Sequence, residues 1–549
     1  MNDLIAGIYS GHDASFAIFE GGNVKLHCEY ERFLRLKEPK GDSFKFLSEQ
    51  FEDYKNIKYF TSVFPAEKLQ QYEDSWRLMN EITKKNNGKF FIFGHHQSHA
   101  ANAFFSSNFN EATIITLDGG GIENENGLAT ALTIWYGKYN KIYPIETLPI
   151  HQINCGTIWT RATRYLFKLS SGFPDGHSAG SCMALSAFSK NPYRFKSDFD
   201  LIFTRDLHLA GFKPPGQPDS IYEGKDPKHP FWQKYRELID NEGQETEFDL
   251  AAGLQLATED LIKKVVRYAL DKSPYKKNLC LSGGVALNAV CFGKLQFENW
   301  FPEIENVYTT PTPHDGGLSI GSCQYLWHQV LDNPREDREG NFSPFLGKQY
   351  SQEEILRGIE KFNGKIEKKY TTDDDVIDLL LDDKIVAVFK GSAESGRRSL
   401  GHRSILANSL SAEIKERLNK IVKERKFYRP FAGSVLREDV KEYFVKDIEN
   451  PYMSFVVPFK EEYKNTFKAL YHPDETNRYQ SVRKSDDEWY YEFIKKWKEK
   501  SGYGIILNTS FNKHSPINET IEHSVECIIN SGIDFLYLPE LKMLIKKRS

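Results

Sequence analysis

Short apolar runs separated by polar turns open the chain. Residues 4–8 form one apolar run, and residues 16–19 and 24–30 form two more, with glycine, aspartate and asparagine in the turns between them. Runs this short, bounded by turn-forming residues, predict β-strands rather than helices. The N-terminus is therefore predicted to begin with a meander of three strands.

The same pattern returns farther along the chain. Apolar runs at 113–117, 128–136 and 141–144 are joined by polar turns at 118–121 and 137–140. We interpret this recurrence as an internal duplication. Two meander-led halves, each beginning with a polar turn that can face phosphate, predict an actin-like ATPase fold of the α/β class.

Length and charge limit what this chain can be. At 549 residues it is too long for one hydrophobic core, so two or more domains are expected. A polar stretch rich in proline, glycine and charge at 333–352 is the predicted boundary. The net charge of −4 and the pI of about 6.5 argue against nucleic acid or a membrane as a partner.

Targeting signals and cysteine usage indicate the compartment. No apolar run approaches the roughly 20 residues of a membrane-spanning helix. The first residues lack the basic and apolar segments of a signal peptide. The seven cysteines are scattered and form no Cys-x-x-Cys pair. We therefore expect a cytoplasmic protein whose thiols are mostly small core residues.

Two histidines and two aspartates form a candidate metal site. His95 and His99 are four residues apart, which on a helix places both imidazoles on one face. Asp118 follows the apolar run 112–117, and Asp315 stands beside two glycines. Taken singly, each could be a capped turn or a hydrogen-bonded core histidine. The four together favour a metal, and mixed nitrogen and oxygen ligands suit iron, manganese or zinc better than magnesium.

Two weaker patterns accompany this site. His12 and Asp13 lie in the first polar turn, where His12 is either ordinary turn chemistry or a general base for a substrate hydroxyl. The apolar run 278–281 leads into Gly283 and Gly284, an arrangement typical of nucleotide binding at a helix N-terminus. By itself the glycine pair is a weak signal.

The C-terminal part concentrates arginine among glycine and serine. The basic residues there are Arg397, Arg398, Arg403, Lys423, Arg425, Arg429, Arg478 and Arg483. Arginine forks bind phosphate oxygens in pairs. The alternative is a solvated basic face, but Arg398 and Arg403 are flanked by glycine and apolar residues. A small phosphate pocket is the preferred interpretation.

Short motifs follow one another in order along nearly the whole chain. Those of the first part are Gly11-His12-Asp13-Ala14-Ser15, His95-x-x-Ser98-His99-Ala100-Ala101, Leu117-Asp118-Gly119, Gly283-Gly284-Val285-Ala286-Leu287-Asn288 and His314-Asp315-x-Gly317. Those of the second are Arg398-Ser399-Leu400-Gly401-x-Arg403-Ser404-Ile405, Arg429-Pro430-Phe431-Ala432, Arg478-x-Gln480-x-Val482 and Leu507-Asn508-Thr509-Ser510-Phe511-Asn512. Together they resemble the NodU/CmcH family of ATP-dependent O-carbamoyltransferases.

The resemblance implies two domains and a two-step reaction. A Kae1-like domain of duplicated actin-like fold would occupy residues 1–340, and a YrdC-like α/β domain residues 350–549. The YrdC-like domain would form carbamoyl adenylate from carbamoyl phosphate and ATP, with Mg²⁺ on the ATP, and release pyrophosphate. In the Kae1-like domain a hydroxyl of a sugar, a sugar-bearing metabolite or a glycan would attack the carbamoyl carbon and expel AMP.

The resemblance also implies residue roles. His12, with Asp13, would assist deprotonation of the acceptor. The ligands of Fe²⁺ or another divalent transition metal would be His95, His99, Asp118 and Asp315. The residues near the nucleotide in the first domain would be Gly119, Gly283, Gly284 and Asn288. The residues that bind carbamoyl phosphate and ATP in the second would be Arg398, Arg403, Lys423, Arg429, Arg478, Asn508 and Ser510.

The chain departs from the family pattern at a few positions. Ser181 and Ala184 stand where relatives commonly have lysine and glycine, which removes a cation from the expected nucleotide contact. Arg397 stands where proline is usual and adds a charge beside the phosphate pocket. Residues 188–247 are expected to shape the acceptor pocket, and a homodimer is possible.

Three other functions stay open. The acceptor could be an amine or a tRNA base, as in threonylcarbamoyl transfer, although the composition offers no basic face for RNA. An actin-superfamily sugar kinase would explain the first domain and leave the arginines unused. A non-catalytic sensor that binds a nucleotide is the third, and the intact metal and phosphate sets argue against it.

Overall fold

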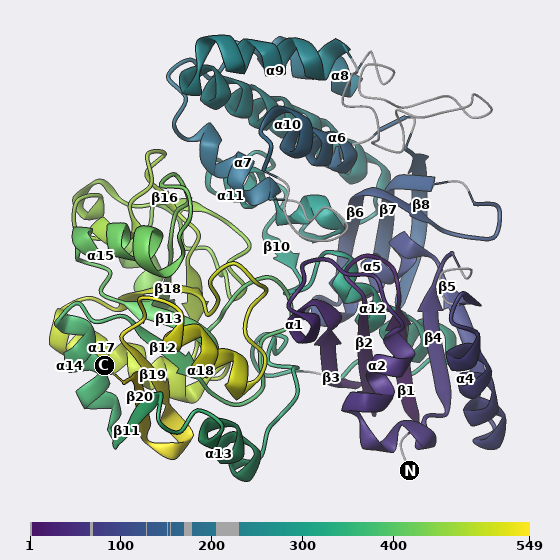
Figure 1. The fold of residues 1–549 in the computed structure, drawn as a ribbon. Coiled ribbons are helices and arrows are strands. Elements are labelled where there is room, and N and C mark those ends of the chain that lie inside the picture. The colour runs from purple at the N-terminus through teal and green to yellow at the C-terminus, as the bar shows by residue number, and fades with distance from the viewer. Residues whose placement is uncertain are drawn as a thin grey trace. The chain divides into compact units, whose positions relative to one another are not determined.

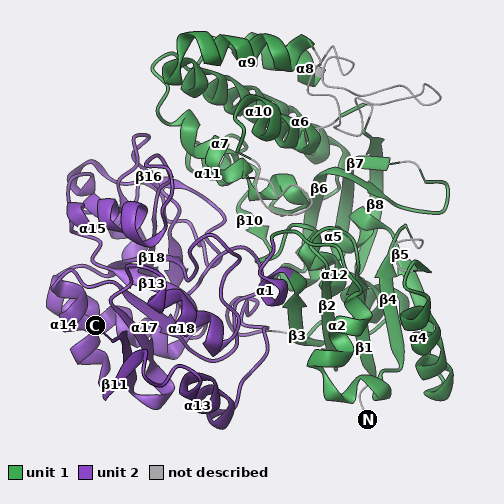
Figure 2. Cartoon of the chain, in the orientation of Figure 1, with its two compact units in different colours: residues 1–30, 37–337 green, residues 31–36, 338–549 purple. Residues whose placement is uncertain are grey.

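Two compact units make up the chain (Figure 2). The computed structural model describes residues 3–65, 70–127, 129–150, 152–153, 155–169, 178–204, 230–336 and 338–548. The first unit comprises residues 1–30 and 37–337, and the second comprises residues 31–36 and 338–549. The short segment 31–36 thus packs with the second unit, although its place in the sequence is inside the first. The roles predicted for the two domains stay predictions.

The first unit starts with a five-stranded sheet of order β3-β2-β1-β4-β5 (Figure 1). β1, β2 and β3 pair antiparallel in turn, whereas β1, β4 and β5 are parallel. The strands are β1 (Leu4–Tyr9), β2 (Ser15–Glu20), β3 (Asn23–Glu29), β4 (Tyr59–Val63) and β5 (Lys89–Phe93). The first three form the meander that the apolar pattern predicted.

A second sheet repeats the first strand for strand. Read from β8, its order is β8-β7-β6-β9-β10, with β6, β7 and β8 antiparallel in turn and β6, β9 and β10 parallel. The strands are β6 (Glu111–Ile122), β7 (Ala129–Lys138), β8 (Lys141–Pro149), β9 (Asn278–Ser282) and β10 (Asn306–Thr309). The repeat confirms the predicted duplication and the actin-like α/β fold.

Two helices join the sheets of this unit. α5 (His95–Ser106) packs on β6 and β9, α12 (Leu318–Gln324) packs on β1 and β2, and the helices pack on each other. Their approach is close, because a Cβ at Gly321 would lie 1.9 Å from the Ser98 carbonyl oxygen. The other described helices before residue 337 are α1 (Tyr30–Leu34), α2 (Ser43–Gln50), α4 (Glu73–Lys85), α6 (Gly156–Arg161), α7 (Ala179–Ser186), α8 (Lys196–Thr204), α9 (Pro230–Glu242), α10 (Gln244–Lys272) and α11 (Ala289–Phe297).

The second unit is built on a mixed eight-stranded sheet. Its order is β11-β20-β19-β12-β13-β18-β14-β17. The strands are β11 (Ile366–Tyr370), β12 (Val386–Phe389), β13 (Arg403–Ala407), β14 (Ala432–Leu436), β17 (Gln480–Val482), β18 (Ile505–Ser510), β19 (Phe535–Leu538) and β20 (Met543–Lys547). The main helices are α13 (Gln352–Glu360), α14 (Asp373–Leu381), α15 (Ala412–Arg417), α17 (Glu488–Ser501) and α18 (Ile521–Ile529).

Apolar side chains of the strands and of α17 form the core of this unit. Val388, Leu406 and Ile506 pack with Phe493 and Trp497 of α17, and all five are buried. Burying an aromatic or branched side chain is worth about 1.5–3 kcal/mol, so this cluster is a main source of the unit's stability. The unit is an α/β unit, as predicted.

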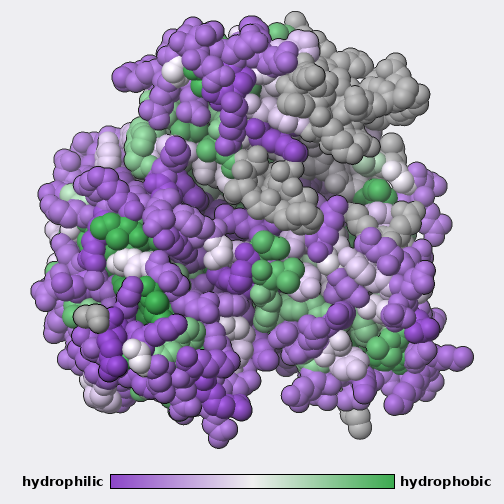
Figure 3. Space-filling model, in the orientation of Figure 1, coloured by the Kyte–Doolittle hydropathy of each residue, from purple (hydrophilic) through white to green (hydrophobic). Residues whose placement is uncertain are grey.

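The surface and the cysteines of the structure agree with what the composition predicted. No helix in the described ranges combines the length and the apolar character needed to cross a bilayer. The face drawn in Figure 3 is mainly hydrophilic, with apolar side chains in small separate groups. All seven cysteines are free, and six of them are buried, which confirms thiols as small core residues.

Candidate functional site

The two predicted histidine ligands lie at the start of α5. His95 and His99 point the same way, with ring centroids 4.8 Å apart, as their spacing predicted. The helix start is held by Glu123, whose carboxylate accepts the backbone N–H groups of His96 and Gln97. A carboxylate at this place satisfies free N–H groups and suits the positive end of the helix dipole.

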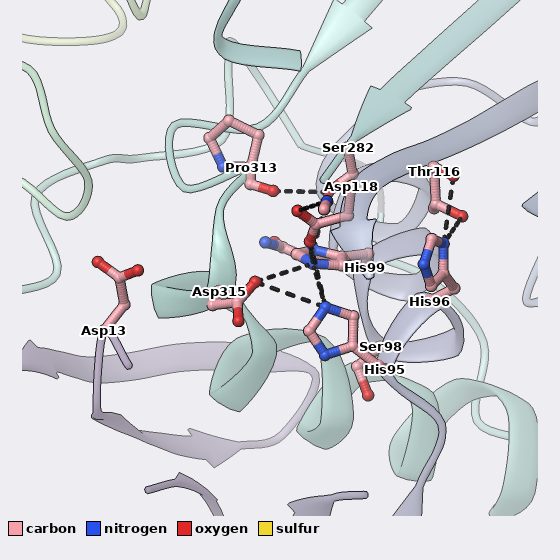
Figure 4. A network of polar contacts seen from close by, with 12 residues as sticks. Asp13, His95, His96, Ser98, His99, Thr116, Asp118, Ser282, Pro313 and Asp315 are labelled. Carbon is pink, nitrogen blue, oxygen red and sulfur yellow. Dashed lines mark hydrogen bonds and ion pairs between the residues drawn. The ribbon is translucent and has the colours of Figure 1, made fainter. Parts of the chain in front are cut away.

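Two carboxylates reach the same point from the ends of parallel strands. Asp118 lies in β6, and Asp315 starts the 3₁₀ turn η4 (Asp315–Gly317) that follows β10. Nε2 of His95 lies 3.2 Å from Asp118 and 3.5 Å from Asp315, and Nε2 of His99 lies 3.1 Å and 3.4 Å from them (Figure 4). Parallel strands carry their carboxyl ends to one sheet edge, a common place for a site in α/β proteins.

This donor set fits one divalent transition metal. One ligand atom from each of the four residues lies within 4.8 Å of all the others, and the two Nε2 atoms are 3.2 Å apart. Ligands bound at about 2.1 Å from one ion stand roughly 3 Å from each other. Two imidazoles and two carboxylates suit iron, manganese or zinc. The structure therefore brings together all four residues predicted as ligands.

Outer contacts orient three of the four ligand side chains. Such contacts fix the direction in which a ligand atom points and tune its affinity for a metal. The contacts are from the Tyr9 hydroxyl to Asp315 (2.7 Å), from the Gly119 N–H to Asp118 (2.6 Å) and between Ser282 Oγ and His99 Nδ1 (3.4 Å). The site is thus supported from both sheets of the unit.

Opposite charges balance at this site. Burial alone would lower the pKa of His95, but Asp315 and Asp118 outweigh burial and raise it to about 10. Burial alone would raise the pKa of Asp118 and Asp315, but the histidines hold both well below the usual range. A bound metal would take the place of the protons on the imidazoles.

His96, between the two ligands in sequence, has a different role. Its ring turns away from the site, with Nδ1 2.9 Å from Thr116 Oγ1 and Nε2 3.0 Å from the Thr130 carbonyl oxygen (Figure 4). Burial, followed by the charges of His95 and His99, lowers the pKa of His96 to about 3. His96 is therefore a neutral residue that ties α5 to the second sheet.

The predicted catalytic pair stands beside Asp315. His12 Nδ1 lies 3.0 Å from Asp13, His12 Nε2 lies 3.3 Å from Asp315, and the His12 side chain is 52% exposed. Partial removal from water would lower the pKa of His12, but Asp315 and Asp13 outweigh this and raise it to about 9. The fold brings the pair to the metal ligands; its catalytic role stays a prediction.

Two further polar side chains near this pair were not predicted. Tyr9 ends β1 and donates its hydroxyl to Asp315. Glu29 ends β3, is buried, and lies 3.2 Å from His314 Nε2, which lies 3.9 Å from Asp13. Tyr9 follows the apolar run 4–8 at the start of a polar turn, whereas Glu29 lies inside the run 24–30 and has no such signal.

Three of the residues predicted for a nucleotide in the first unit surround Asp118. Gly119 is its neighbour in β6. Gly283 has a φ of 90°, and a Cβ there would lie 2.3 Å from the Leu117 carbonyl oxygen; a Cβ at Gly284 would lie 3.1 Å from the Asp118 carboxylate. Only glycine tolerates this conformation and this closeness. The glycines therefore keep backbone close to the site.

The remaining predictions for the first unit have mixed outcomes. Asn288 caps α11 with its side chain, and its nucleotide contact stays a prediction. Ser181 and Ala184 are buried in α7. Of the residues 188–247 expected to shape the acceptor pocket, 205–229 lie outside the described residues.

Three arginines predicted to bind phosphate lie near one another in the second unit, and we call Arg398, Arg429 and Arg478 the guanidinium cluster. Burial, and then the charges of Arg478, Arg397 and Arg429, lower the pKa of Arg398. Burial and Arg429 lower that of Arg478 to about 10. In the part of the chain that the structure describes, no carboxylate pairs with the cluster, and Arg478 Nε has no hydrogen-bond partner. Like charges held together in this way favour a bound anion, and arginine suits phosphate.

Two residues predicted to bind phosphate take part in the framework of this unit. The side chain of the fully buried Arg403 donates to four backbone carbonyls, at 2.6 to 3.3 Å, and stacks on the Phe389 ring at 3.6 Å. Asn508, also fully buried, donates to Ser434 Oγ at 2.9 Å. Because these contacts occupy both side chains, we assign them to the framework rather than to a ligand.

Lys423 and Ser510 shape the loop that follows β18. The buried Lys423 donates to the backbone carbonyls of Ser510 and Asn512 and to Asn512 Oδ1 at 2.8 Å. The Ser510 hydroxyl donates to Asn512 Oδ1 at 2.7 Å. The lysine predicted as a phosphate ligand thus spends much of its hydrogen bonding on the loop itself.

Two family models match this chain. The model described as carbamoyltransferase N-terminus matches residues 67–323, and the one described as carbamoyltransferase C-terminus matches residues 377–547. The first range contains the four metal-site residues, and the second contains the guanidinium cluster.

Known relatives match along most of their length. The nodulation protein NolNO of Sinorhizobium fredii is 30% identical over 98% of this chain and 79% of its own. A 3'-hydroxymethylcephem-O-carbamoyltransferase of Amycolatopsis lactamdurans is 26% identical over 74% of each chain. Among solved structures, HypF of T. kodakarensis is 16% identical with a TM-score of 0.35 and covers 60% of this chain and 48% of that one. A likeness at that score carries no argument.

Proposed function

The chain belongs to the carbamoyltransferase family, and we propose that it is an ATP-dependent O-carbamoyltransferase that works through carbamoyl adenylate. One observation carries the proposal: a His–Asp cluster that suits a cation and a guanidinium cluster that suits phosphate occur in the same chain. A carbamoyl group is a poor electrophile until its leaving group is a good one. A mixed anhydride with AMP supplies such a leaving group.

The first step would use carbamoyl phosphate and ATP in the second unit. For the atoms to balance, the phosphate of carbamoyl phosphate leaves as inorganic phosphate and one water is consumed. A carbamate oxygen then attacks the α-phosphorus of ATP and expels pyrophosphate, with Mg²⁺ on the ATP. The cluster of Arg398, Arg429 and Arg478 would neutralise the phosphate charges, since anion binding relieves the mutual repulsion of the guanidinium groups.

The second step would move the carbamoyl group to a hydroxyl and release AMP. The name of the Amycolatopsis relative, a cephem O-carbamoyltransferase, supports a hydroxyl rather than an amine acceptor. We propose a sugar or sugar-bearing metabolite as the acceptor. An adenylate hydrolyses readily, so its use demands a site from which water is excluded.

The residues around Asp315 would carry this second step. His95, His99, Asp118 and Asp315 would hold a divalent transition metal, which supplies Lewis acidity when bound. With a cation on Asp315 to offset the charge that holds the pKa of His12 near 9, His12 would take the proton of the acceptor hydroxyl at Nε2. Asp13, 3.0 Å from Nδ1, would orient the ring.

Isotope exchange tests the first step. The protein is incubated with ATP, Mg²⁺ and labelled pyrophosphate, with and without carbamoyl phosphate, and label entering ATP is counted. We expect exchange that depends on carbamoyl phosphate. ADP formation without exchange would favour a sugar kinase, and absence of exchange with every metal tried would reject the proposal.

Substitution of His12 tests the division of labour. His12→Asn should leave exchange within about twofold of wild type and abolish the additional AMP release that hydroxyl-bearing sugars cause. Arg77→Ala, at a residue of α4 whose side chain is 73% exposed, is the control and should change neither rate. Loss of exchange in His12→Asn would show that the two steps are not separated as proposed.

A further inference from the structure

Residues 31–36, which we call the strap, belong to the second unit although both flanks belong to the first. The residues on either side of the strap hydrogen-bond to the backbone of the same residue, Ala14. Tyr30 N–H donates to the Ala14 carbonyl at 2.8 Å, and Ala14 N–H donates to the Pro39 carbonyl at 3.1 Å. The strap is therefore a closed excursion of the chain rather than a loose connection.

Arg35 of the strap holds the loop that follows β18. Its guanidinium donates to Ser515 Oγ at 2.6 Å, to Asn518 Oδ1 at 2.7 Å, and to the carbonyls of Pro516 and Ile517 at 2.8 Å each. Four acceptors from four consecutive residues fix the path of that loop. The same loop begins at Ser510 and is held at its other end by Lys423.

Arg32 of the strap holds the loop between β12 and β13. It is 2% exposed and donates to the Gly396 carbonyl at 2.5 Å. Gly396 has a φ of 91° and directly precedes Arg397 and Arg398. A hydrogen bond at this glycine controls the direction in which the next two residues leave it.

Each loop also has an anchor from within the unit. The buried Glu394 carboxylate accepts the backbone N–H groups of Leu400, His402 and Arg403, at 2.7 to 3.1 Å, in the loop that carries Arg398. Lys423 anchors the loop that begins at Ser510, by donating to the backbone carbonyls of Ser510 and Asn512. Thus two loops, one that carries Arg398 and one that begins at Ser510, each have one inner anchor and one strap arginine.

We propose that Arg32 and Arg35 are positioning residues for the phosphate pocket of the second unit, so that adenylate formation depends on a segment from the first forty residues of the chain. This inference rests on the proposed function. Within the described residues, the hydrogen bonds of the Arg35 guanidinium go to oxygens of the protein itself. The strap would therefore act by fixing the loop that carries Arg398 and the loop that begins at Ser510.

Equilibrium binding of ATP and the exchange assay test this inference in the full-length chain. The variants are Arg35→Ala, Arg35→Lys and Arg32→Ala. The matched control is Arg357→Ala, because Arg357 is an exposed arginine of the same unit on α13. Thermal unfolding and metal content are recorded for each protein, so that loss of fold is recognised.

Arg35→Ala and Arg32→Ala should raise the ATP Kd and the KM for carbamoyl phosphate at least tenfold, with metal content unchanged and kcat less affected than KM. Arg35→Lys, which keeps the charge without the fork, should lie between. Added guanidinium ion should partly restore Arg35→Ala, which a general loss of stability would not allow.

Values within twofold of wild type in both alanine variants would overturn the inference. If Arg35→Ala does not fold, Asn518→Ala against Asn518→Asp replaces it, because only the second keeps the acceptor that lies 2.7 Å from Arg35. A wild-type protein that binds ATP but shows no exchange would reject the proposed function, and the binding comparison would still decide the role of the strap. A wild-type protein that binds no ATP would reject both.

Discussion

The two candidate sites arrange charge in opposite ways. In the first unit each imidazole Nε2 lies within 3.5 Å of two carboxylates. In the second, Arg398, Arg429 and Arg478 are near enough to one another to lower the pKa of Arg398. The first site is balanced before any ligand arrives, whereas the second carries repulsion that an anion relieves. One is organised to exchange protons for a metal ion and the other to bind phosphate.

The sites also differ in the elements that carry them. The metal-site residues lie on α5, on β6 and in η4. The guanidinium cluster lies in three loops, one between β12 and β13, one before β14 and one before β17. Regular elements hold a side chain through their own backbone hydrogen bonds. Loops need added anchors, and the strap supplies one to the loop that carries Arg398.

Removal of one guanidinium group should give the largest effect. Arg398→Ala should lower carbamoyl-phosphate-dependent exchange by about 100-fold or more, since truncating a buried charged partner costs about 2–5 kcal/mol. Metal content should not change. Arg398→Lys should recover only part of the rate. The control variant Arg357→Ala should keep the wild-type rate. Exchange that survives in Arg398→Ala would remove the phosphate role from the second site.

Removal of a metal ligand should give the reverse pattern. His99→Ala should lower the affinity for Fe²⁺, Mn²⁺ or Zn²⁺ by more than about 100-fold, because even outer contacts of a metal ligand are worth about 10–100-fold. Bound metal is measured by atomic spectroscopy after dialysis, and exchange should stay within twofold of wild type. Arg77→Ala, at an exposed residue of α4, is the control. A variant that loses exchange together with metal would break the contrast between the sites.

Loss of an outer contact should give a smaller shift. Tyr9→Phe keeps the ring but removes the hydroxyl that donates to Asp315 at 2.7 Å. Metal affinity should fall by about tenfold. The exchange rate should not change. An unchanged metal affinity would mean that Asp315 is oriented by the backbone of η4 alone.

The pH dependence of stability tests the charge that the strap brings to the second unit, through His523, whose pKa burial and Arg35 of the strap lower. Burial, and then the charge of Arg35, lowers the pKa of His523 to about 4 from 6.5. The unfolded chain therefore binds a proton that the folded chain refuses, so stability present above pH 6.5 is lost as pH falls from about 6.5 to about 4, by about 1–3 kcal/mol.

His523→Gln should flatten this loss. Glutamine can keep the capping box that Thr520 and His523 form at the start of α18 but does not titrate. Urea unfolding at pH 7 and at pH 5 measures the difference. Equal losses in wild type and variant would show that burial and Arg35 do not lower the pKa of His523 in the folded chain.

Local patterns predicted much of the fold. The apolar runs at 16–19 and 278–281 became β2 and β9 with ends shifted by one residue at most, and the repeat of meanders became two sheets of equal order. The four-residue spacing of His95 and His99 placed both rings on one face. These are short-range properties, set by the period of a helix or strand.

Other features had no local signal. Arg398 and Arg403 lie five residues apart in similar surroundings, yet Arg398 joins the guanidinium cluster while Arg403 is used up by carbonyls and the Phe389 ring. Which arginine meets solvent and which meets backbone depends on contacts distant in sequence. The same holds for Tyr9, whose hydroxyl meets a carboxylate 306 residues away.

The sequence by itself determined the types of elements, the duplication and the chemical character of both sites, because residue type and spacing act locally. Only the tertiary structure decided that Asp315 closes the metal site with a tyrosine behind it. It alone decided that residues 31–36 leave one unit to anchor the loops of the other. Both depend on where distant backbone comes to rest, which is settled by packing rather than by any local pattern.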